Sequence, residues 1–174
     1  MNIDNDYFQH LESLEDKEIR KKYKFLGEGI SRRVYDLNNG LVLKLAKDRE
    51  GHYQNRIENY VYTTASEEQK KYLCPILYYS PRIVIMKKAK PLTDTINSKT
   101  LDLKTVRNED RAEDEINALA EEFYLYYDDV IAVNSWGNLD GVNVLIDYGC
   151  TSETGDLYYH MLFWLYEVNK SERN

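Results

Sequence analysis

The sequence has few of the residues and segments that mark cross-linked, flexible or membrane-spanning proteins. Its 174 residues include only 2 cysteines, 3 prolines and 8 glycines. Cys74 and Cys150 are far apart and form no C-x-x-C pair, so neither a disulfide framework nor a zinc site is expected. So little glycine and proline indicates no long flexible linker. No apolar stretch reaches the roughly 18 residues of a membrane span, and we expect no membrane partner.

The sequence also lacks an excess of basic charge and an apolar leader. With 23 lysines and arginines against 30 aspartates and glutamates, its net charge is -7. A protein that binds nucleic acid non-specifically normally has a basic surface, so no nucleic-acid partner is expected. The short basic run at 87–90 is interpreted as a solvated loop. Residues 1–6 are acidic and carry no apolar core of a signal peptide, which predicts a cytoplasmic, reducing environment.

What is present indicates a single globular domain with a sheet-rich first half. The composition is 43% hydrophobic and 30% charged, as in ordinary folded domains. Apolar spacing predicts a helix over 7–22 that lies on a sheet. Residues 23–45, which alternate at 33–37 and carry turn residues at 38–40, are predicted to form three antiparallel strands. A helix is expected at 52–65, a short helical segment at 67–72, and two more strands at 76–79 and 82–86. The first half would then contain five strands and one internal helix.

The second half is predicted to be mainly helical. The expected elements are a helix at 109–127, a strand pair at 136–139 and 142–146, and a last helix at 155–169. The strand pair surrounds Asp140 and Gly141, which are typical of a tight turn. Four side chains of the last helix are expected in the core, with a dimer or partner face as the alternative: Tyr158, Leu162, Leu165 and Tyr166.

Three features of the first half suggest phosphate binding. Gly27 and Gly29 lie between two predicted strands, where glycine lets backbone N–H groups approach phosphate oxygens; the alternative is a plain hairpin. Lys44 interrupts an apolar strand and could neutralise phosphates, or simply face water. Glu58, on the next predicted helix, could pair with Lys44; the alternative is an ordinary solvated glutamate.

A cluster in the second half suggests metal binding. Asn134 follows Asp129 by five positions, and Asp147 follows Asn134 by thirteen, with the predicted hairpin between them. A tight hairpin brings its ends together, so Asn134 and Asp147 are expected side by side. Their oxygens suit Mg2+, a hard cation. Asp129, one loop away, could orient or deprotonate an attacking hydroxyl.

In this order, the features resemble the protein kinase superfamily. The first loop is similar to G-x-G-x-x-G-x-V at Gly27, Gly29 and Val34, but Arg32 stands in place of the third glycine. Lys44 resembles the nucleotide lysine of the third strand. The resemblance implies a protein kinase-like α+β fold: a five-stranded antiparallel N-lobe sheet with one internal helix, and a truncated, mainly helical C-lobe. It also implies one domain over 1–174, with lobes at about 1–88 and 89–174.

The second half carries the rest of the resemblance. The spacing of Asp129 and Asn134 is similar to that of the catalytic loop, and Asp147 opens a segment that resembles the metal-binding D-F-G. The resemblance implies ATP and Mg2+ as cofactors. The implied roles are ATP binding by Gly27, Gly29, Ser31, Val34, Lys44 and Glu58; Mg2+ binding by Asn134 and Asp147; and catalysis by Asp129 and Lys44.

Three observations narrow or qualify this resemblance. Segments 54–58 (Gln-Asn-x-x-Glu) and 134–137 (Asn-x-Trp-Gly) look like those of small kinase-like proteins of phages and prophages. Where His-Arg-Asp is expected, the sequence reads Tyr127-Asp128-Asp129, and Asp128 could take the role of its neighbour. Only 25 residues follow Gly149, too few for the usual activation segment and peptide-docking helices.

Three functions are therefore predicted as alternatives. The first is an Mg-ATP-dependent phosphotransferase that acts on a protein or small-molecule hydroxyl. The second is a catalytically inactive pseudokinase, an interaction module of phage origin aimed at a host protein. The third is a small structural α+β protein in which the motifs occur by chance.

Overall fold

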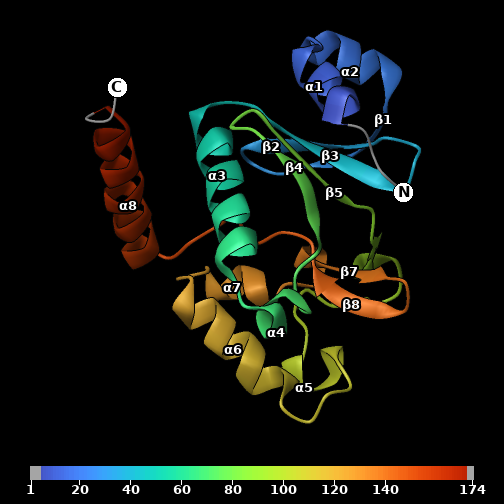
Figure 1. Ribbon diagram of the computed structural model, residues 1–174. Helices are drawn as coiled ribbons and strands as arrows, with labels where there is room; N and C mark the ends of the chain where they lie inside the picture. Colours follow the sequence, from blue (N-terminus) through green and yellow to red (C-terminus); the bar gives the residue numbers. More distant parts are fainter. Residues whose placement is uncertain (1–4, 172–174) are drawn as a thin grey trace.

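The computed structural model describes residues 5–171 and has an α+β fold (Figure 1). Residues 1–4 and 172–174 belong to the predicted domain but lie outside the described residues. The first of these ranges is most of the segment 1–6 that is interpreted as acidic. The main sheet is five-stranded and antiparallel, with strand order β1-β2-β3-β5-β4. Its strands are β1 (Lys24–Glu28), β2 (Arg32–Asp36), β3 (Leu41–Ala46), β4 (Ile76–Tyr79) and β5 (Ile83–Lys87).

The predicted three-strand start of the sheet is confirmed, together with its turn. Asn38 and Gly40 have positive φ angles of 61° and 81°, the backbone conformation that asparagine and glycine tolerate best. The Asp36 side chain accepts a hydrogen bond from the Asn38 N–H at 2.9 Å, which closes the turn locally. This turn holds β2 and β3 in register, with Val34 opposite Lys44.

The helix predicted over 7–22 is wrong in one respect, because the chain forms two helices. These are α1 (Asn5–Ser13) and α2 (Asp16–Lys22). Glu15 starts the second helix: its side chain caps the first turn, and its N–H donates to Glu18 Oε2 at 2.7 Å. Both helices cover one face of the sheet, as expected, through a core shared by Phe8, Leu11, Ile19, Leu43 and Ile85.

The internal helix α3 (Arg49–Thr64) covers the opposite face of the sheet (Figure 1). Its start is fixed by Asp48, whose side chain accepts the Gly51 N–H at 3.0 Å. A short helix, α4 (Glu67–Lys70), follows and begins with a capping box at Ser66. With five strands and an internal helix, the predicted fold class is confirmed.

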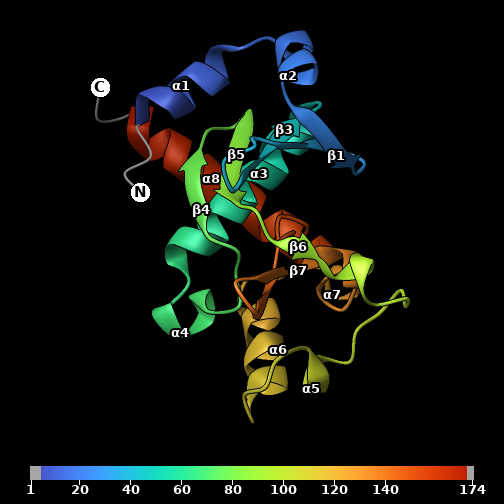
Figure 2. The same cartoon turned by 90° about the vertical axis from the view of Figure 1, so that its right-hand side faces the viewer.

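The second lobe is mainly helical and contains a small sheet of order β6-β7-β8, whose strand β6 was not predicted (Figure 2). Its elements are β6 (Lys90–Pro91), η1 (Leu92–Asp94), α5 (Leu103–Val106), α6 (Ala112–Glu122), α7 (Tyr127–Val130), η2 (Val133–Ser135), β7 (Trp136–Leu139), β8 (Val142–Leu145) and α8 (Glu153–Ser171).

The predicted helix over 109–127 is too long at both ends. Helix α6 stops at Glu122 because Tyr124 takes a left-handed φ of 51° and the Leu125 N–H bonds back to the Ala120 carbonyl at 2.9 Å. The predicted hairpin is correct: Asp140 and Gly141 have φ angles of 52° and 90° at its turn.

A core cluster continues from the first lobe into the second. It includes Val42 and Ile57 from the sheet and α3, and Trp136, Phe123 and Phe163 from the second lobe. The two lobes therefore share buried apolar surface, and the first lobe has a second, separate core under α1 and α2.

The side-chain placement predicted for the last helix is wrong. Tyr158, Leu165 and Tyr166 are 39%, 48% and 54% exposed, and Leu162 is only partly buried. Tyr159 and Phe163 instead make the buried contacts of α8. Among the described residues, no helix has both the length and the apolar character needed to cross a membrane.

Candidate functional site

A cavity of about 350 Å³ opens between the main sheet and the β7–β8 hairpin. It gathers polar groups and apolar walls from both lobes. The lining residues are Leu26, Gly27, Glu28, Gly29, Val34, Val42, Lys44, Met86, Lys87, Ala89, Pro91, Thr93, Asn134, Ile146 and Asp147. We call this cavity the cleft.

Strand β3 is buried on both faces of the sheet, and Lys44 lies on the face that borders the cleft. Successive strand residues point to opposite faces. Leu43 and Leu45 accordingly join the core under α1 and α2, while Val42 and Lys44 face the cleft. Lys44 is 5% exposed, so its charge needs partners from the protein.

Glu58 supplies the main partner of Lys44, as the sequence suggested. It lies fully buried on α3, and its Oε1 accepts from Lys44 Nζ at 2.7 Å. The same oxygen accepts the Tyr148 N–H at 3.1 Å. Glu58 therefore links the strand lysine to the backbone beside Asp147, and it does not line the cleft itself.

The hairpin brings Asn134 and Asp147 to the same side of the cleft. The Ile146 N–H donates to the Ser135 carbonyl at 2.8 Å, and the next residue on each side is Asp147 and Asn134. Both side chains face the cavity, and the Asp147 side chain is 54% exposed.

Asp147 is held in its charged form. Desolvation acts to raise the pKa of this carboxyl, but the charges of Lys44 and Arg32 and their hydrogen bonds outweigh it and hold the pKa below its usual range. Lys44 Nζ lies 3.4 Å from Asp147 Oδ1 and also donates to the Ile146 carbonyl at 2.7 Å.

Close packing holds the segment after Asp147 against α3. A Cβ built on Gly149 would lie 2.6 Å from the Gln54 carbonyl oxygen, so this position has room only for glycine.

The loop that contains Gly27 and Gly29, here called the glycine loop, borders the cleft, and one of its amides is bonded within the loop turn. A Cβ on Gly27 or Gly29 would meet no atom within 4 Å, so packing does not require glycine here. The Gly29 N–H donates to the Arg32 carbonyl at 3.0 Å, which leaves this amide engaged within the turn. Ser31 does not line the cleft: its hydroxyl donates to Gln54 Oε1 at 2.6 Å.

Asp129 lies on α7, outside the cleft lining, in a half-buried position. Burial raises the pKa of its carboxyl; a hydrogen bond with Cys150 lowers it, and the charges of Asp147 and Asp128 raise it. Asp128 is exposed and accepts from the Tyr126 hydroxyl at 3.1 Å. Of the two adjacent aspartates, Asp129 therefore has the environment that favours a protonatable group near Asp147.

Arg32 is the functional candidate that the motif comparison missed. It was noticed only as a departure from the third glycine, yet its guanidinium is buried and joins two carboxylates. Nη1 donates to Glu58 Oε2 at 2.8 Å and to Asn55 Oδ1 at 3.3 Å, and Nη2 donates to Asp147 Oδ1. The only sign of this role in the sequence is a basic residue at the start of β2, shortly after Gly27 and Gly29.

The oxygen donors of the cleft suit a divalent metal by type, and one of them is already engaged. Carboxylate and amide oxygens, as on Asp147 and Asn134, are what Mg2+ takes. Asp147 Oδ1 is, however, bound by Arg32 and Lys44. Within residues 5–171, no three or more acidic, histidine or cysteine side chains gather in a way that could hold a metal.

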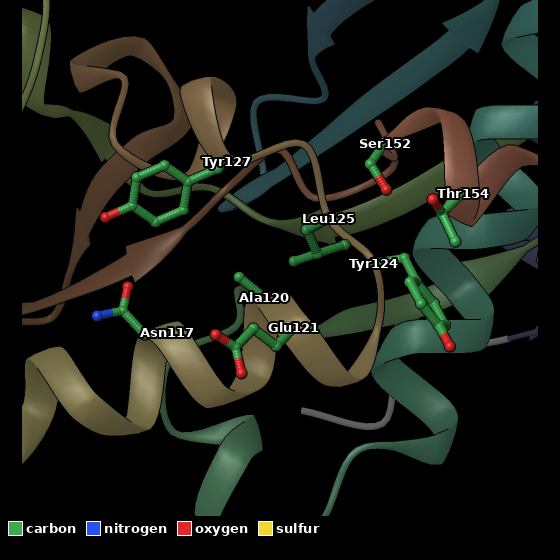
Figure 3. Close-up of a pocket in the computed structure, with 8 residues that line it drawn as sticks. All are labelled: Asn117, Ala120, Glu121, Tyr124, Leu125, Tyr127, Ser152 and Thr154. Atoms are coloured by element: carbon green, nitrogen blue, oxygen red, sulfur yellow. The ribbon is translucent and has the colours of Figure 1, made fainter.

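A second cavity, of about 580 Å³, lies in the helical lobe between α6 and the segments around Tyr127 and Ser152 (Figure 3). Asn117 and Glu121 reach it from α6, and Ser152 and Thr154 come from the start of α8. Asn117 Oδ1 is buried there and has no hydrogen-bond partner within residues 5–171. Neither lysine nor arginine is among the residues that line this cavity, whereas Lys44 lines the cleft, so the cleft is the better candidate for an anionic ligand.

Comparisons with known proteins add a partial structural likeness. No protein-family model matches the chain, and no curated protein matches it. Among solved structures, a ternary complex of APH(2")-IIa with streptomycin and ATP is similar to 52% of this chain, at 23% sequence identity and a TM-score of 0.35. The chain spans only 30% of the length of that protein. The protein kinase-like fold is therefore assigned on the geometry of the chain itself: a five-stranded antiparallel sheet, one internal helix whose glutamate pairs with a strand lysine, and a mainly helical second lobe.

Proposed function

We propose that this protein binds ATP in the cleft and transfers its γ-phosphate to a hydroxyl acceptor, on a protein or a small molecule. One observation carries the proposal. Lys44 and Asp147 are separated by 103 positions in the sequence, yet both line the same 350 Å³ cavity with the loop glycines and Asn134.

The cleft has distinct regions for the two ends of a nucleotide. Val34, Val42, Met86 and Ala89 form apolar walls, which suit a planar base. Lys44, which is 5% exposed, would neutralise phosphate oxygens, while Glu58 fixes its position. The placement of these groups would supply most of the catalysis, because phosphoryl transfer depends mainly on orientation and charge neutralisation.

Phosphoryl transfer adds two requirements beyond binding. Asn134 and the second carboxylate oxygen of Asp147, Oδ2, would hold Mg2+ for the transfer step, while Oδ1 stays with Arg32 and Lys44; the metal, when bound, neutralises charge on the phosphates. Asp129 would orient the acceptor hydroxyl and accept its proton, a role to which its raised pKa is suited.

A second candidate is an interaction module that binds nucleotide without turnover. The contact of Arg32 with Asp147 favours it, because the carboxylate expected to take a metal already has a cation. Phage origin and a host-protein partner belong to this candidate and rest on the resemblance at 54–58 and 134–137.

Binding is tested by thermal unfolding with ATP. A ligand at 100 times its dissociation constant stabilises the folded state by about 2.7 kcal/mol. Lys44→Ala should abolish the ATP-dependent shift, whereas Lys104→Ala, at a lysine whose side chain is 70% exposed and away from the cleft, should keep it. Absence of any shift in the wild type would refute the proposal.

Gly29→Ala is a variant that separates binding from folding. No atom lies within 4 Å of the added Cβ, so unfolding without ATP should be unchanged. Gly29 lines the cleft, so the added methyl group should weaken ATP binding.

Turnover is tested separately with γ-labelled ATP and pools of peptides and small hydroxyl compounds. Asp129→Asn should abolish transfer while ATP binding persists. If the wild type transfers no label, the interaction module becomes the better candidate.

A further inference from the structure

The environment of Arg32 is that of a cation built into the site rather than a surface residue. Its side chain is 6% exposed and lies between Glu58, which is fully buried, and Asp147. Asn55, also fully buried, accepts from the same nitrogen as Glu58 and is anchored by its own bond to the Pro81 carbonyl at 3.0 Å. A planar guanidinium suits such bridging because its N–H groups point in fixed directions.

The charges of this cluster balance without a metal. Arg32 and Lys44 provide two positive charges, and Glu58 and Asp147 provide two negative charges, all within direct contact. An uncompensated Asp147 carboxylate would repel the phosphates of a nucleotide in the same cavity. Because Arg32 and Lys44 both contact it, this carboxylate is already neutralised when the ligand arrives.

A divalent cation that bound both oxygens of Asp147 would have to displace Arg32 from Oδ1. Displacing the guanidinium would leave a buried arginine with Glu58 and Asn55 but without one of its two carboxylates, which is costly in a desolvated position. The position of Arg32 is also fixed from its backbone, because its carbonyl closes the turn of the glycine loop.

We propose that Arg32 is the resident cation of Asp147, so that the cleft binds ATP without a divalent metal. The inference rests on the proposed nucleotide binding and concerns how that same site neutralises charge. Binding would be carried by Lys44 and by a glycine loop whose turn is tied through Arg32 to Asp147.

The test measures ATP affinity calorimetrically, in excess Mg2+ and in EDTA. For the wild type, the two dissociation constants should agree within about threefold. Arg32→Gln removes the charge and keeps a side-chain donor, so in EDTA it should bind ATP at least about tenfold more weakly than the wild type. Added Mg2+ should then restore the affinity of this variant, because Asp147 becomes available as a ligand.

A second variant guards against misfolding of Arg32→Gln. Asp147→Asn removes the charge that needs a cation, so its ATP affinity should be as independent of Mg2+ as that of the wild type. Titration of the nucleotide-free protein with Mn2+, followed by paramagnetic resonance, should detect binding only in Arg32→Gln.

The outcomes distinguish failure of this inference from failure of the proposed nucleotide binding. If wild-type protein binds ATP only with Mg2+, or if nucleotide-free wild type binds Mn2+ at Asp147, Arg32 is not a substitute for the metal, although the nucleotide site stands. If ATP binds under neither condition, the nucleotide site itself is refuted, and the inference falls with it.

Discussion

At the scale of single residues, the site depends on buried charges whose partners come from distant parts of the chain. Glu58 illustrates this, because its two oxygens accept from Lys44, Arg32 and the Tyr148 N–H. Such a network is stable only when every member is paired. The Lys44–Glu58 pair could be predicted from the sequence because a lysine in an apolar strand needs a counter-ion, and a glutamate follows on the next helix.

Arg32 could not be predicted in the same way. Its neighbour Arg33 has the same chemistry in the sequence, and strand alternation alone does not say which arginine points inward. Only the structure shows that Arg32 is 5% exposed and reaches Asp147, whereas Arg33 lies near Glu28 at the edge, 3.3 Å from it. Sequence reasoning thus named several residues that line the cleft, together with Ser31, Glu58 and Asp129, which do not line it, and it gave no role to Arg32.

The Asp129–Cys150 contact makes a prediction about thiol reactivity. Burial raises the pKa of the Cys150 thiol to about 12, with further contributions from the charge and hydrogen bond of Asp129. Asp129→Asn removes that charge, so it should speed alkylation of Cys150 by iodoacetamide at neutral pH, because more thiolate forms. Cys74, whose burial also raises its pKa to about 12, is the internal control. An unchanged rate at Cys150 would mean that Asp129 does not hold the thiol.

Asp36 makes a prediction about acid stability. It is 6% exposed, and its bonds to Lys88 Nζ at 2.6 Å and to the Asn38 N–H lower its pKa from 3.8. A lowered folded-state pKa contributes stability that is present above 3.8 and is lost as the pH falls through the folded value. Wild type should therefore exceed Asp36→Asn in free energy of unfolding at pH 7, and the difference should shrink as the pH falls below 3.8.

Urea denaturation at a series of pH values measures this difference. Asp140→Asn, at an exposed turn residue, is the matched control. A gap between wild type and Asp36→Asn that stays constant on acidification would contradict the assigned pairing.

At the scale of elements, the strands were predictable and the helix ends were not. Strand β3 follows from a short apolar run after a turn, and the β7–β8 hairpin follows from turn residues with positive φ; both are local properties. The break between α1 and α2, and the end of α6 at Glu122, depend on capping bonds that compete with continued helix. Strand β6 has only two residues and exists because it pairs with β7, so no local pattern indicates it.

Helix α8 gives a prediction about which of its faces stabilises the fold. Phe163 is 5% exposed and contacts the rings of Tyr53 and Tyr60, with the Arg56 guanidinium 4.1 Å from its ring centroid. Phe163→Ala should lower the free energy of unfolding by about 3–5 kcal/mol, as for other buried aromatic side chains. Trp164, one residue on, is 63% exposed, and Trp164→Phe should leave stability nearly unchanged. Equal losses in the two variants would show that α8 packs through a different face.

At the scale of the whole molecule, the cleft lies between lobes that share one continuous core. Val42, Ile57 and Met86 of the first lobe belong to the same buried cluster as Trp136 and Leu145 of the second. The Cys74 N–H also donates to the Leu145 carbonyl at 2.8 Å, and the Leu145 N–H donates to the Tyr72 carbonyl at 2.7 Å, which bonds the lobes through their backbones. A site assembled from both lobes is held rigidly when the lobes cannot open independently.

This continuity predicts that both lobes unfold in one cooperative transition. The chain has 2 tryptophans, and Trp136 is fully buried in the second lobe, where its Nε1 donates to the Val130 carbonyl at 2.7 Å. In Trp164→Phe, fluorescence reports on Trp136 alone, whereas far-UV circular dichroism reports on both lobes. The two urea transitions should coincide, because separating the lobes would expose the shared core. If Trp136 is released at lower urea than the loss of dichroism, the lobes unfold separately, and Lys44 and Asp147 are held together less firmly than the shared core implies.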